Sequence, residues 1–299
     1  MVKKSSAKKA QPKKTSVKKA PQKSFPWAEV IIVGLIVAIC GFSLFVLVNN
    51  AQKTDYVVET NAFFAPFEFY DNNKIVGVDV EIIDRVAEKL NKTIAIKDVE
   101  FDVIIDNVEA GRIADAGAAG LTITDARKAK VDFSTPYYTS VQYAIFDKNS
   151  GLAGKSYVTW NDLSGAILGS QTGSTGYLFT QGEIKDGVLM DTGTMIKGFE
   201  THQLAADAIG SQMIDFAIAD ELVAKMIVAK NANLVALPLY YMGENGAADY
   251  PVEESYAIAV NKNQPELLNA FNEVLAEMLV EDANGESEID RLVLKYTGF

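Results

Sequence analysis

Hydrophobic residues are distributed in two different ways along the 299-residue chain. Residues 30–48 form one unbroken run of nineteen residues without a charge. A helix with a rise of 1.5 Å per residue would make this run about 28 Å long, close to the hydrocarbon thickness of a bilayer. The run therefore predicts a transmembrane anchor over residues 27–49, with the amphipathic ring of Trp27 at its N-terminal edge.

After a polar tether, short apolar runs alternate with stretches of helical spacing. Strands are predicted at residues 56–59, 114–119, 143–146, 166–169, 214–218 and 256–260. Helical spacing covers residues 82–90, 103–111, 174–179, 221–228 and 265–278. We expect residues 77–80 to be extended and Asp79 to cap the first of these helices. This alternation is typical of an α/β fold with parallel strands.

The distribution of charged residues also changes at the apolar run: the segment before it is basic, and the rest of the chain is acidic. Residues 1–26 carry nine lysines and no acidic residue, whereas the other 273 residues hold 19 basic and 39 acidic side chains. We expect residues 1–26 to be a disordered, Lys-rich cytoplasmic tail, and the chain after the anchor to lie outside the cytoplasm. The acidic body would repel a phosphate backbone, so we expect no nucleic-acid partner for it, although the tail alone could attract polyanions.

Two other fates of the apolar run are weighed against an uncleaved anchor. Signal cleavage would best fall after Ala51, but Asn49 then occupies a position that needs a small residue. Lipidation would use Cys40, but the bulky Ile39 precedes it. We favour the anchor, and therefore a single-pass membrane protein with its binding domain outside the cytoplasm.

Single cysteine and histidine residues limit the chemistry of the chain. Cys40 cannot form an intramolecular disulfide or a thiolate cluster, and no site can contain two imidazoles. We therefore expect no cofactor, no metal and no catalytic residue. His202 lies near a predicted helix start, where we expect it to be solvated or to act as a cap.

One stretch, residues 111–138, combines small residues with ligand-binding side chains. A strand of small residues leads into a loop with Gly120 and Thr122, followed by Arg127. Small residues let backbone N–H groups approach a ligand, and a guanidinium matches the geometry of a carboxylate. The loop is therefore a candidate carboxylate site.

Other segments supply complementary groups. Gly173, Ser174 and Thr175 precede a predicted helix, whose N-terminus can hold an anion. Asp220 ends a predicted strand and could receive an ammonium group. Aromatic residues at 63–67 could form walls. An anion site and a cation site between aromatic walls would suit a free α-amino acid.

The chain resembles the extracellular amino-acid-binding proteins of ABC importers, a branch of the type II periplasmic binding proteins. The resemblance spans residues 56–299 and rests on segments 63–91, 120–138, 173–179, 215–221 and 256–268, in the order and spacing of that family. It implies a fold of two α/β lobes joined by two hinge strands, with the ligand in the cleft between them. It also implies lobe boundaries at residues 50–141 and 254–299 for the first lobe and 142–253 for the second.

The resemblance further assigns roles in the cleft. Gly120, Thr122 and Arg127 fall on the pattern that holds the α-carboxylate, which Ser174 and Thr175 complete. Asp220 falls on the partner of the α-ammonium. The aromatic walls fall on Phe64 and Phe101, and the position that selects the ligand side chain falls on Asn61.

Asn61 departs from relatives in which this selector is Asp or Glu. An amide cannot neutralise a charge, so we expect a ligand with an uncharged side chain. Ala119 also replaces a serine found in some relatives. The carboxylate of Glu68 is the one group that could reverse this expectation, if it turned into the pocket.

Three functions are compared. The first is a monomeric solute-binding protein that captures an amino acid and delivers it to an ABC permease, which we favour. The second is an enzyme resembling cyclohexadienyl dehydratases, which would need a general acid in the cleft. The third is a sensory domain, which would need an output domain that residues 1–26 do not resemble.

Overall fold

The computed structural model describes residues 54–243 and 248–298. Residues Lys53–Phe299 form one compact unit. The predicted tail and anchor, residues 1–26 and 27–49, lie outside the described residues. Within the described ranges, no helix combines the length and apolar character needed to cross a membrane.

The first lobe is built on a five-stranded sheet with the strand order β5-β1-β6-β16-β7. Strand β1 pairs in parallel with β5 and β6, whereas β16 runs antiparallel to β6 and β7. A small antiparallel sheet, β2-β3-β4, follows β1. The strands are β1 (Tyr56–Thr60), β2 (Phe63–Phe64), β3 (Glu68–Asp71), β4 (Lys74–Val76), β5 (Ile94–Asp98), β6 (Ala116–Gly117), β7 (Asp132–Phe133) and β16 (Ala259–Val260).

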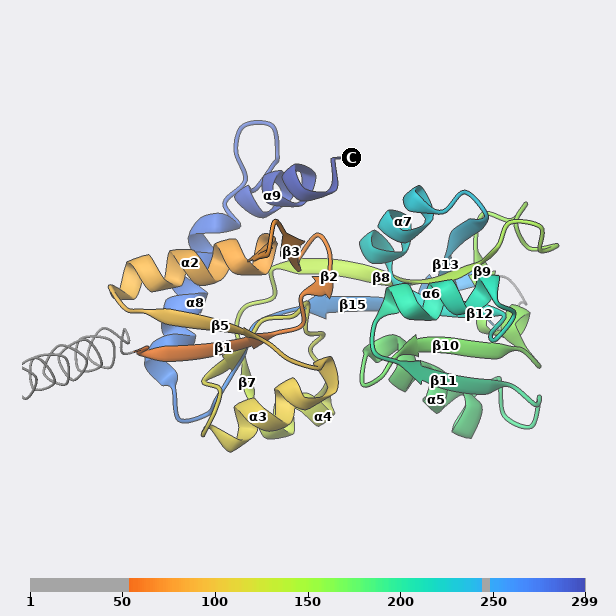
Figure 1. Ribbon diagram of the computed structural model, residues 1–299, viewed down its shortest axis with the longest axis horizontal. Coiled ribbons are helices and arrows are strands. Elements are labelled where there is room, and N and C mark those ends of the chain that lie inside the picture. The colour runs from red at the N-terminus through yellow and green to blue at the C-terminus, as the bar shows by residue number, and fades with distance from the viewer. Residues whose placement is uncertain (1–53, 244–247, 299) are drawn as a thin grey trace, which may run out of the picture. The chain divides into compact units, whose positions relative to one another are not determined.

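Helices cover both faces of this sheet, because neighbouring strand residues point to opposite sides. Val260 packs in the cluster with α2 and α8, while the preceding Ala259 packs with α3. Helix α9 also contacts α2 (Figure 1). The helices are α2 (Val78–Leu90), α3 (Ile104–Ala110), α4 (Asp125–Lys130), α8 (Pro265–Met278) and α9 (Glu288–Thr297), and a 3-10 turn, η1, spans Phe101–Val103.

The second lobe has a sheet with the order β11-β10-β12-β8-β13-β14, in which β9 pairs with β13. Helices α6 and α7 pack on one face, and α5 packs with the 3-10 turn η2 on the other. Its strands are β8 (Tyr138–Asp147), β9 (Val158–Thr159), β10 (Ile167–Gln171), β11 (Met195–Phe199), β12 (Phe216–Asp220), β13 (Leu234–Met242) and β14 (Ala248–Pro251). Its helices are α5 (Thr175–Asp186), α6 (His202–Gly210) and α7 (Glu221–Lys230), and η2 spans Trp160–Leu163.

Two antiparallel strands join the lobes. β8 continues from the first lobe into the sheet of the second, and β15 (Glu253–Tyr256) pairs with it on the way back (Figure 1). The expected fold of two α/β lobes with two connecting strands is therefore confirmed.

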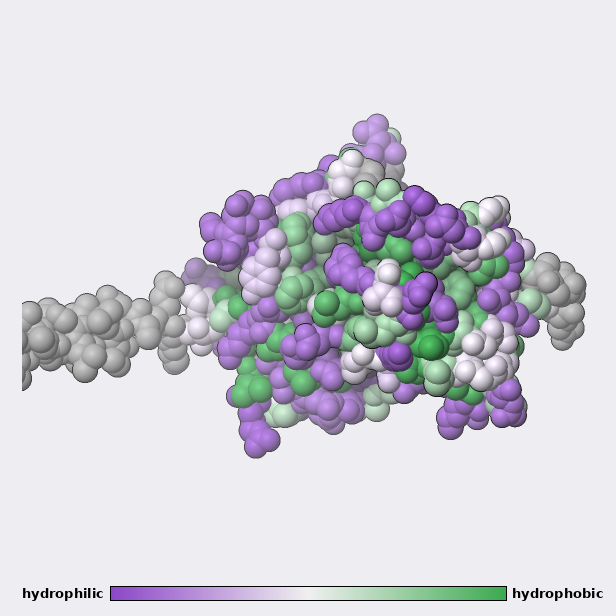
Figure 2. Space-filling model, turned by 45° about the vertical axis from the view of Figure 1, so that its right-hand side comes forward, coloured by the Kyte–Doolittle hydropathy of each residue, from purple (hydrophilic) through white to green (hydrophobic). Residues whose placement is uncertain are grey.

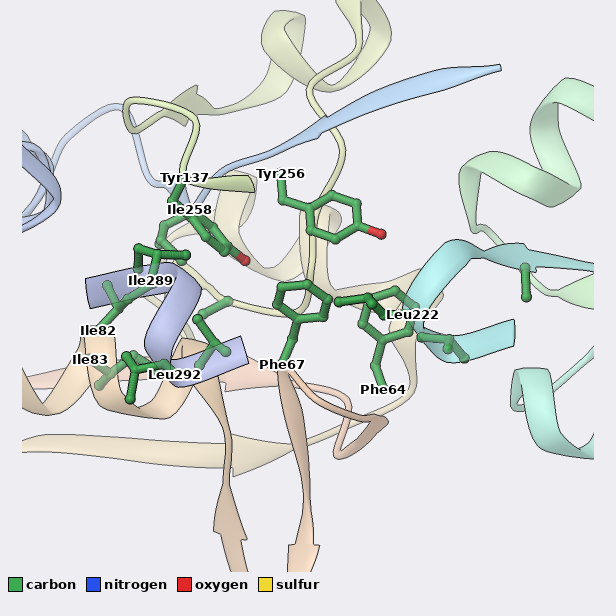
Figure 3. Packing of buried hydrophobic residues seen from close by; sticks show 14 of the residues in the cluster. Phe64, Phe67, Ile82, Ile83, Tyr137, Leu222, Tyr256, Ile258, Ile289 and Leu292 are labelled. Atoms are coloured by element: carbon green, nitrogen blue, oxygen red, sulfur yellow. The ribbon is translucent and has the colours of Figure 1, made fainter. Parts of the chain in front are cut away.

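The largest hydrophobic cluster extends from the first lobe into the second. Phe64, Phe67 and Tyr256 lie together at the end of the first lobe, and Leu222 of α7 joins them (Figure 3). The ring centroids of Phe67 and Tyr256 are 5.1 Å apart with the rings edge to face. The outer surface, in contrast, mixes hydrophilic residues with scattered apolar ones (Figure 2).

Most predicted elements are confirmed, but three predicted extended segments and one predicted cap are wrong in detail. Residues 77–80 are not extended, because α2 already begins at Val78. Asp79 does not cap that helix: its side chain is buried and accepts hydrogen bonds from the Gly120 amide and the Tyr137 hydroxyl. The predicted strand 114–119 is reduced to Ala116–Gly117, and the predicted strand 256–260 is split between the end of β15 at Tyr256 and β16 at Ala259–Val260.

Candidate functional site

The loop after β6 is shaped by Gly120. Its φ of +52° lies in the left-handed region, and an added Cβ would come within 2.4 Å of the Phe64 ring. Its amide donates to the buried Asp79 carboxylate over 3.1 Å. Burial raises the pKa of Asp79 to about 6, although its hydrogen bonds from Tyr137 and Gly120 oppose the rise. Glycine at this position thus brings the loop backbone against an aromatic wall.

Arg127 is almost completely buried behind this loop. It lies on the short helix α4, where the Thr124 hydroxyl accepts from its backbone amide. Its guanidinium donates to the Thr122 carbonyl over 2.8 Å and to the Gly173 carbonyl over 3.0 Å. It also lies 5.6 Å from the centroid of the Phe101 ring. Burial lowers the pKa of Arg127, and the carboxylates of Glu254 and Asp220 oppose this effect.

The start of α5 faces the carboxylate loop from the second lobe. The sequence allows Ser174 or Thr175 to cap this helix, and the structure has Ser174 as the N-cap, accepting from the Tyr177 amide. Gly173 has a φ of +78°, and a Cβ there would lie 2.9 Å from Cβ of Asp102 in the first lobe. The hydroxyls of Thr122 and Thr175 are 3.2 Å apart across the cleft. The two candidate carboxylate segments therefore meet.

Asp220 ends β12 and is buried beside a second carboxyl group. Gln142 donates a hydrogen bond to it, and Glu254 of β15 lies next to it. Burial raises the pKa of Asp220 well above its ordinary value, and the charge of Glu254 raises it further. Glu254 in turn accepts a hydrogen bond from the Thr122 hydroxyl over 3.1 Å. The site therefore has a buried carboxyl pair that an ammonium group could neutralise.

Most of these groups line one small cavity between the lobes. It leaves only about 10 Å³ in which the centre of a water molecule can move, so an amino acid needs the lobes to part before it can enter. A larger and more open depression of about 610 Å³ lies elsewhere on the second lobe and contains none of the predicted residues. The small cavity is lined by Phe64, Phe101, Ala119, Gly120, Thr122, Gln171, Ser174, Thr175, His202 and Asp220.

Two of the nine predicted residues do not line the cavity. Arg127 lies behind its wall, bound to backbone carbonyls of both lobes. Asn61 is also buried, donating to the Val99 carbonyl and accepting from the side chain of Gln171. Glu68 is not among the lining residues either. Asn61 is thus separated from the cavity and hydrogen-bonded to Gln171, which lines it.

Sequence reasoning missed Gln171, His202 and Glu254. Gln171 follows the predicted strand 166–169 by two residues and ends the observed strand β10, so its position just before Gly173 was a usable signal. The expectation that His202 is solvated or a cap is wrong: it is 2% exposed, and Thr201 caps α6 instead. Glu254 had no local signal, because only the pairing of β15 with β8 brings it to the cleft.

Metal binding has no support in the described ranges. There, no group of three or more His, Cys, Asp or Glu side chains is arranged to hold a metal ion. The polar side chains that line the cavity are instead one carboxyl, hydroxyls, an amide and an imidazole. The Arg127 guanidinium and the Glu254 carboxyl lie near it without lining it. They match a small zwitterion better than a metal or a phosphate.

Known proteins resemble this chain over most of its length. A probable histidine-binding protein of Campylobacter jejuni is 29% identical over 250 residues, which cover 83% of this chain and 87% of that protein. The arginine-binding extracellular protein ArtP of Bacillus subtilis is 29% identical over 240 residues, 80% of this chain and 86% of ArtP.

This chain is also similar to a solved structure of an amino-acid-binding protein. The amino acid ABC transporter substrate-binding protein AbpA of Streptococcus pneumoniae, bound to L-arginine, aligns with a TM-score of 0.67 and 28% identity, covering 80% of this chain and 93% of AbpA. The profile of the bacterial extracellular solute-binding proteins, family 3, matches residues 56–298. These relatives are binding proteins and not enzymes. The chain belongs to the bacterial extracellular solute-binding proteins of family 3.

Proposed function

We propose that this chain captures a free amino acid in the cleft between its lobes and delivers it to an ABC importer. The observation that carries the proposal is that a buried carboxyl group lines the cavity and a buried guanidinium lies just behind the cavity wall. Arg127 and Asp220 come from different lobes and are close enough for the carboxylate to raise the pKa of the guanidinium. Their charges complement the α-carboxylate and the α-ammonium of an amino acid.

In this proposal the ligand replaces one contact within the first lobe and one between the lobes. The α-carboxylate would take the place of the Thr122 and Gly173 carbonyls on the Arg127 guanidinium and would also meet the α5 N-terminus. The α-ammonium would lie at Asp220. Phe64 and Phe101 would enclose the side chain. Residues 50–141 and 254–299 would move as one lobe and residues 142–253 as the other.

The ligand side chain is proposed to be uncharged. Asp220 is the only acidic residue that lines the described cavity, and the α-ammonium would use it. Asn61 offers an amide already engaged by Gln171, and Glu68 lies outside the lining. The similar proteins that bind arginine or histidine therefore do not by themselves set the ligand of this chain.

Substitution of the two charged residues tests the proposal. Truncating one partner of a buried charge pair costs roughly 2–5 kcal/mol, so Arg127→Met and Asp220→Asn should weaken amino-acid binding about 30-fold to several thousand-fold. Isothermal titration of the full chain measures this. Arg112→Met, in an exposed turn, is the control. Unchanged affinity in Arg127→Met, with normal thermal unfolding, would contradict the proposal.

Membrane anchoring by residues 27–49 belongs to the same proposal, because a tether keeps a monomeric receptor near its permease. The support is the uncharged run at residues 30–48. The full chain should stay with membranes after an alkaline wash, since apolar burial does not depend on charge. A shorter chain released into the medium would instead show signal cleavage.

A further inference from the structure

Asp79 is a buried carboxylate that the proposed ligand contacts do not use. It lies in the first turn of α2, is 0% exposed and is not among the residues that line the cavity. Its Oδ2 atom accepts from the Gly120 amide over 3.1 Å, and its Oδ1 atom accepts from the Tyr137 hydroxyl. Its own amide donates to the Phe67 carbonyl. Asp79 therefore connects α2 to the loop after β6 and to the segment that leads into β8.

The bond to Gly120 acts on the backbone of the loop after β6, residues 118–124. Because the Gly120 N–H is used within the protein, it is not available to a ligand. Two residues further, Thr122 lines the cavity, and its carbonyl accepts from the Arg127 guanidinium over 2.8 Å. The position of the loop backbone thus decides where Thr122 and Arg127 lie.

The bond to Tyr137 reaches both strands that connect the lobes. Tyr137 directly precedes β8, and its backbone amide donates to the Tyr256 carbonyl at the end of β15 over 2.9 Å. Its ring lies beside those of Phe67 and Tyr256, with centroids 6.4 and 6.5 Å away (Figure 3). Asp79 thus lies where the loop after β6 meets the connecting strands in the first lobe.

The hydrogen bonds of Asp79 suit an ionised carboxyl group. Both partners are donors, so each oxygen acts as an acceptor and neither needs a proton. The N-terminus of the 13-residue helix α2 also favours a negative charge. Burial raises the pKa of Asp79 to about 6, while its bonds from Tyr137 and Gly120 oppose the rise. The group is therefore ionised at pH 7, in a place where a buried charge costs stability.

Glu68 is the titratable neighbour of Asp79. It lies on β3, which contacts α2, and it is 0% exposed. Neither of its carboxyl oxygens has a hydrogen-bond partner in the described ranges. Burial, and then the charge of Asp79, raise the pKa of Glu68 well above its ordinary value. Of these two groups, therefore, only Asp79 carries a negative charge at pH 7.

We propose that Asp79 is a positioning residue for amino-acid binding, and that its charged side chain holds the loop after β6 in the conformation in which Thr122 lines the cavity. The inference rests on the proposed function and adds a residue on which affinity depends although it touches no ligand atom. Without the carboxylate the loop would adopt other conformations as well, and the apparent affinity would fall with the fraction of molecules that keep the competent one.

Asp79→Asn tests the inference on the full chain with little change in size. An amide has one acceptor oxygen where the carboxylate has two, so it cannot accept from both donors. Amino-acid binding should weaken about 5- to 150-fold, which corresponds to the cost of about 1–3 kcal/mol for a buried donor without its partner. Titration calorimetry measures this with the amino acid, among the twenty, that most raises the melting temperature of the natural chain.

Two further measurements separate positioning from general stability. The folded-state pKa of Asp79, about 6, lies above its ordinary value of 3.8, so its ionisation has a cost that grows between these pH values and is complete at pH 7. The melting temperature of Asp79→Asn at pH 7 should be no lower than that of the natural chain, because relief of the buried charge offsets the lost hydrogen bond. Hydrogen exchange of residues 118–124 in the ligand-free protein should, in contrast, become faster.

Two variants serve as matched controls. Asp84→Asn makes the same chemical change at an exposed position of α2 and should alter neither affinity nor exchange. Tyr137→Phe removes the other donor but leaves the bond between Asp79 and Gly120. It should therefore reduce affinity by less than about fivefold, the equivalent of about 1 kcal/mol, and leave the exchange of residues 118–124 slow.

Three results would overturn the inference. Natural affinity in Asp79→Asn would show that the loop needs no carboxylate. A melting temperature that falls together with affinity would reduce Asp79 to a general structural role. Equal weakening by Tyr137→Phe and Asp79→Asn, with exchange of the loop unchanged in both, would assign the effect to the connecting strands. In each case the natural chain still binds an amino acid, so the proposed function stands; if none of the twenty binds, the proposed function fails and the inference fails with it.

Discussion

At the residue scale, the carboxyl groups of Asp220 and Glu254 lie side by side with limited access to water. Two buried neighbouring carboxyls cannot both ionise cheaply, so the pair retains a proton until a cation arrives. Burial, and then the charge of Glu254, raises the pKa of Asp220 well above its ordinary value of 3.8. An α-ammonium group at this point would favour the ionised form and lower that pKa again.

This pair predicts proton release on ligand binding. Below the raised pKa of Asp220, the free protein holds a proton that the complex, with its lower pKa, releases. Affinity should therefore rise with pH between these two pKa values, by up to about tenfold per pH unit. Titration calorimetry in buffers of different ionisation enthalpy measures the released proton.

Glu254→Gln provides the matched variant for this prediction. It keeps an acceptor for the Thr122 hydroxyl but removes the charge that raises the pKa of Asp220. The pH window should shrink, and binding at acidic pH should improve relative to the natural chain. Tyr256, Gln142 and Arg127 also surround the pair and are unchanged in this comparison. Proton uptake on binding would contradict the prediction.

At the scale of elements, the guanidinium of Arg127 is carried by a helix of only six residues. A helix this short is not stable by itself and depends on its ends. Thr124 supplies the N-cap by accepting from the Arg127 backbone amide over 3.2 Å. The hydrogen bond that caps α4 therefore also fixes the backbone of Arg127, the residue proposed to bind the α-carboxylate.

Loss of this cap should weaken binding indirectly. Substituting a capping Thr by Ala costs about 1 kcal/mol, so Thr124→Ala should reduce amino-acid affinity by at most about fivefold. Thr124→Ser keeps the hydroxyl and should restore it. Titration calorimetry and thermal unfolding together provide the measurement. A lower melting temperature with unchanged affinity would mean that α4 does not need its cap to hold Arg127.

At the scale of the whole molecule, hydrogen bonds across the cleft hold the lobes together. Gln171 donates to Asn61, Arg127 donates to the Gly173 carbonyl, and the Thr122 and Thr175 hydroxyls meet. The cavity between them is too small for an amino acid. Entry of a ligand therefore requires an opening about β8 and β15, and its contacts to both lobes would then favour closure.

Ligand should accordingly shift the lobes from open to closed. Small-angle scattering of the full chain should give a smaller radius of gyration when a saturating amino acid is present. In Arg127→Met the same concentration should produce little change, because one half of the proposed closing contacts is missing. An identical scattering curve with and without a bound ligand would rule out closure on binding.

The sequence by itself determined the features that depend on neighbouring residues. The 3.6-residue spacing in α2 and α8, the capping hydroxyl at Ser174 and the small residues around Gly120 act within one turn or one loop. The sequence motifs occur in the same order as in the solute-binding family, and this order predicted the two-lobed fold. They also identified seven residues that line one cavity.

Tertiary structure alone decided which side chains converge and what each of them can still offer. Asp79 leaves its expected capping position for the Gly120 amide, and Asn61 binds Gln171 instead of lining the cavity. His202 and Glu254 reach the cleft only through packing of α6 on its sheet and pairing of β15 with β8. The physical reason is that burial and hydrogen-bond partners arise from contacts between residues tens of positions apart, which no local pattern encodes.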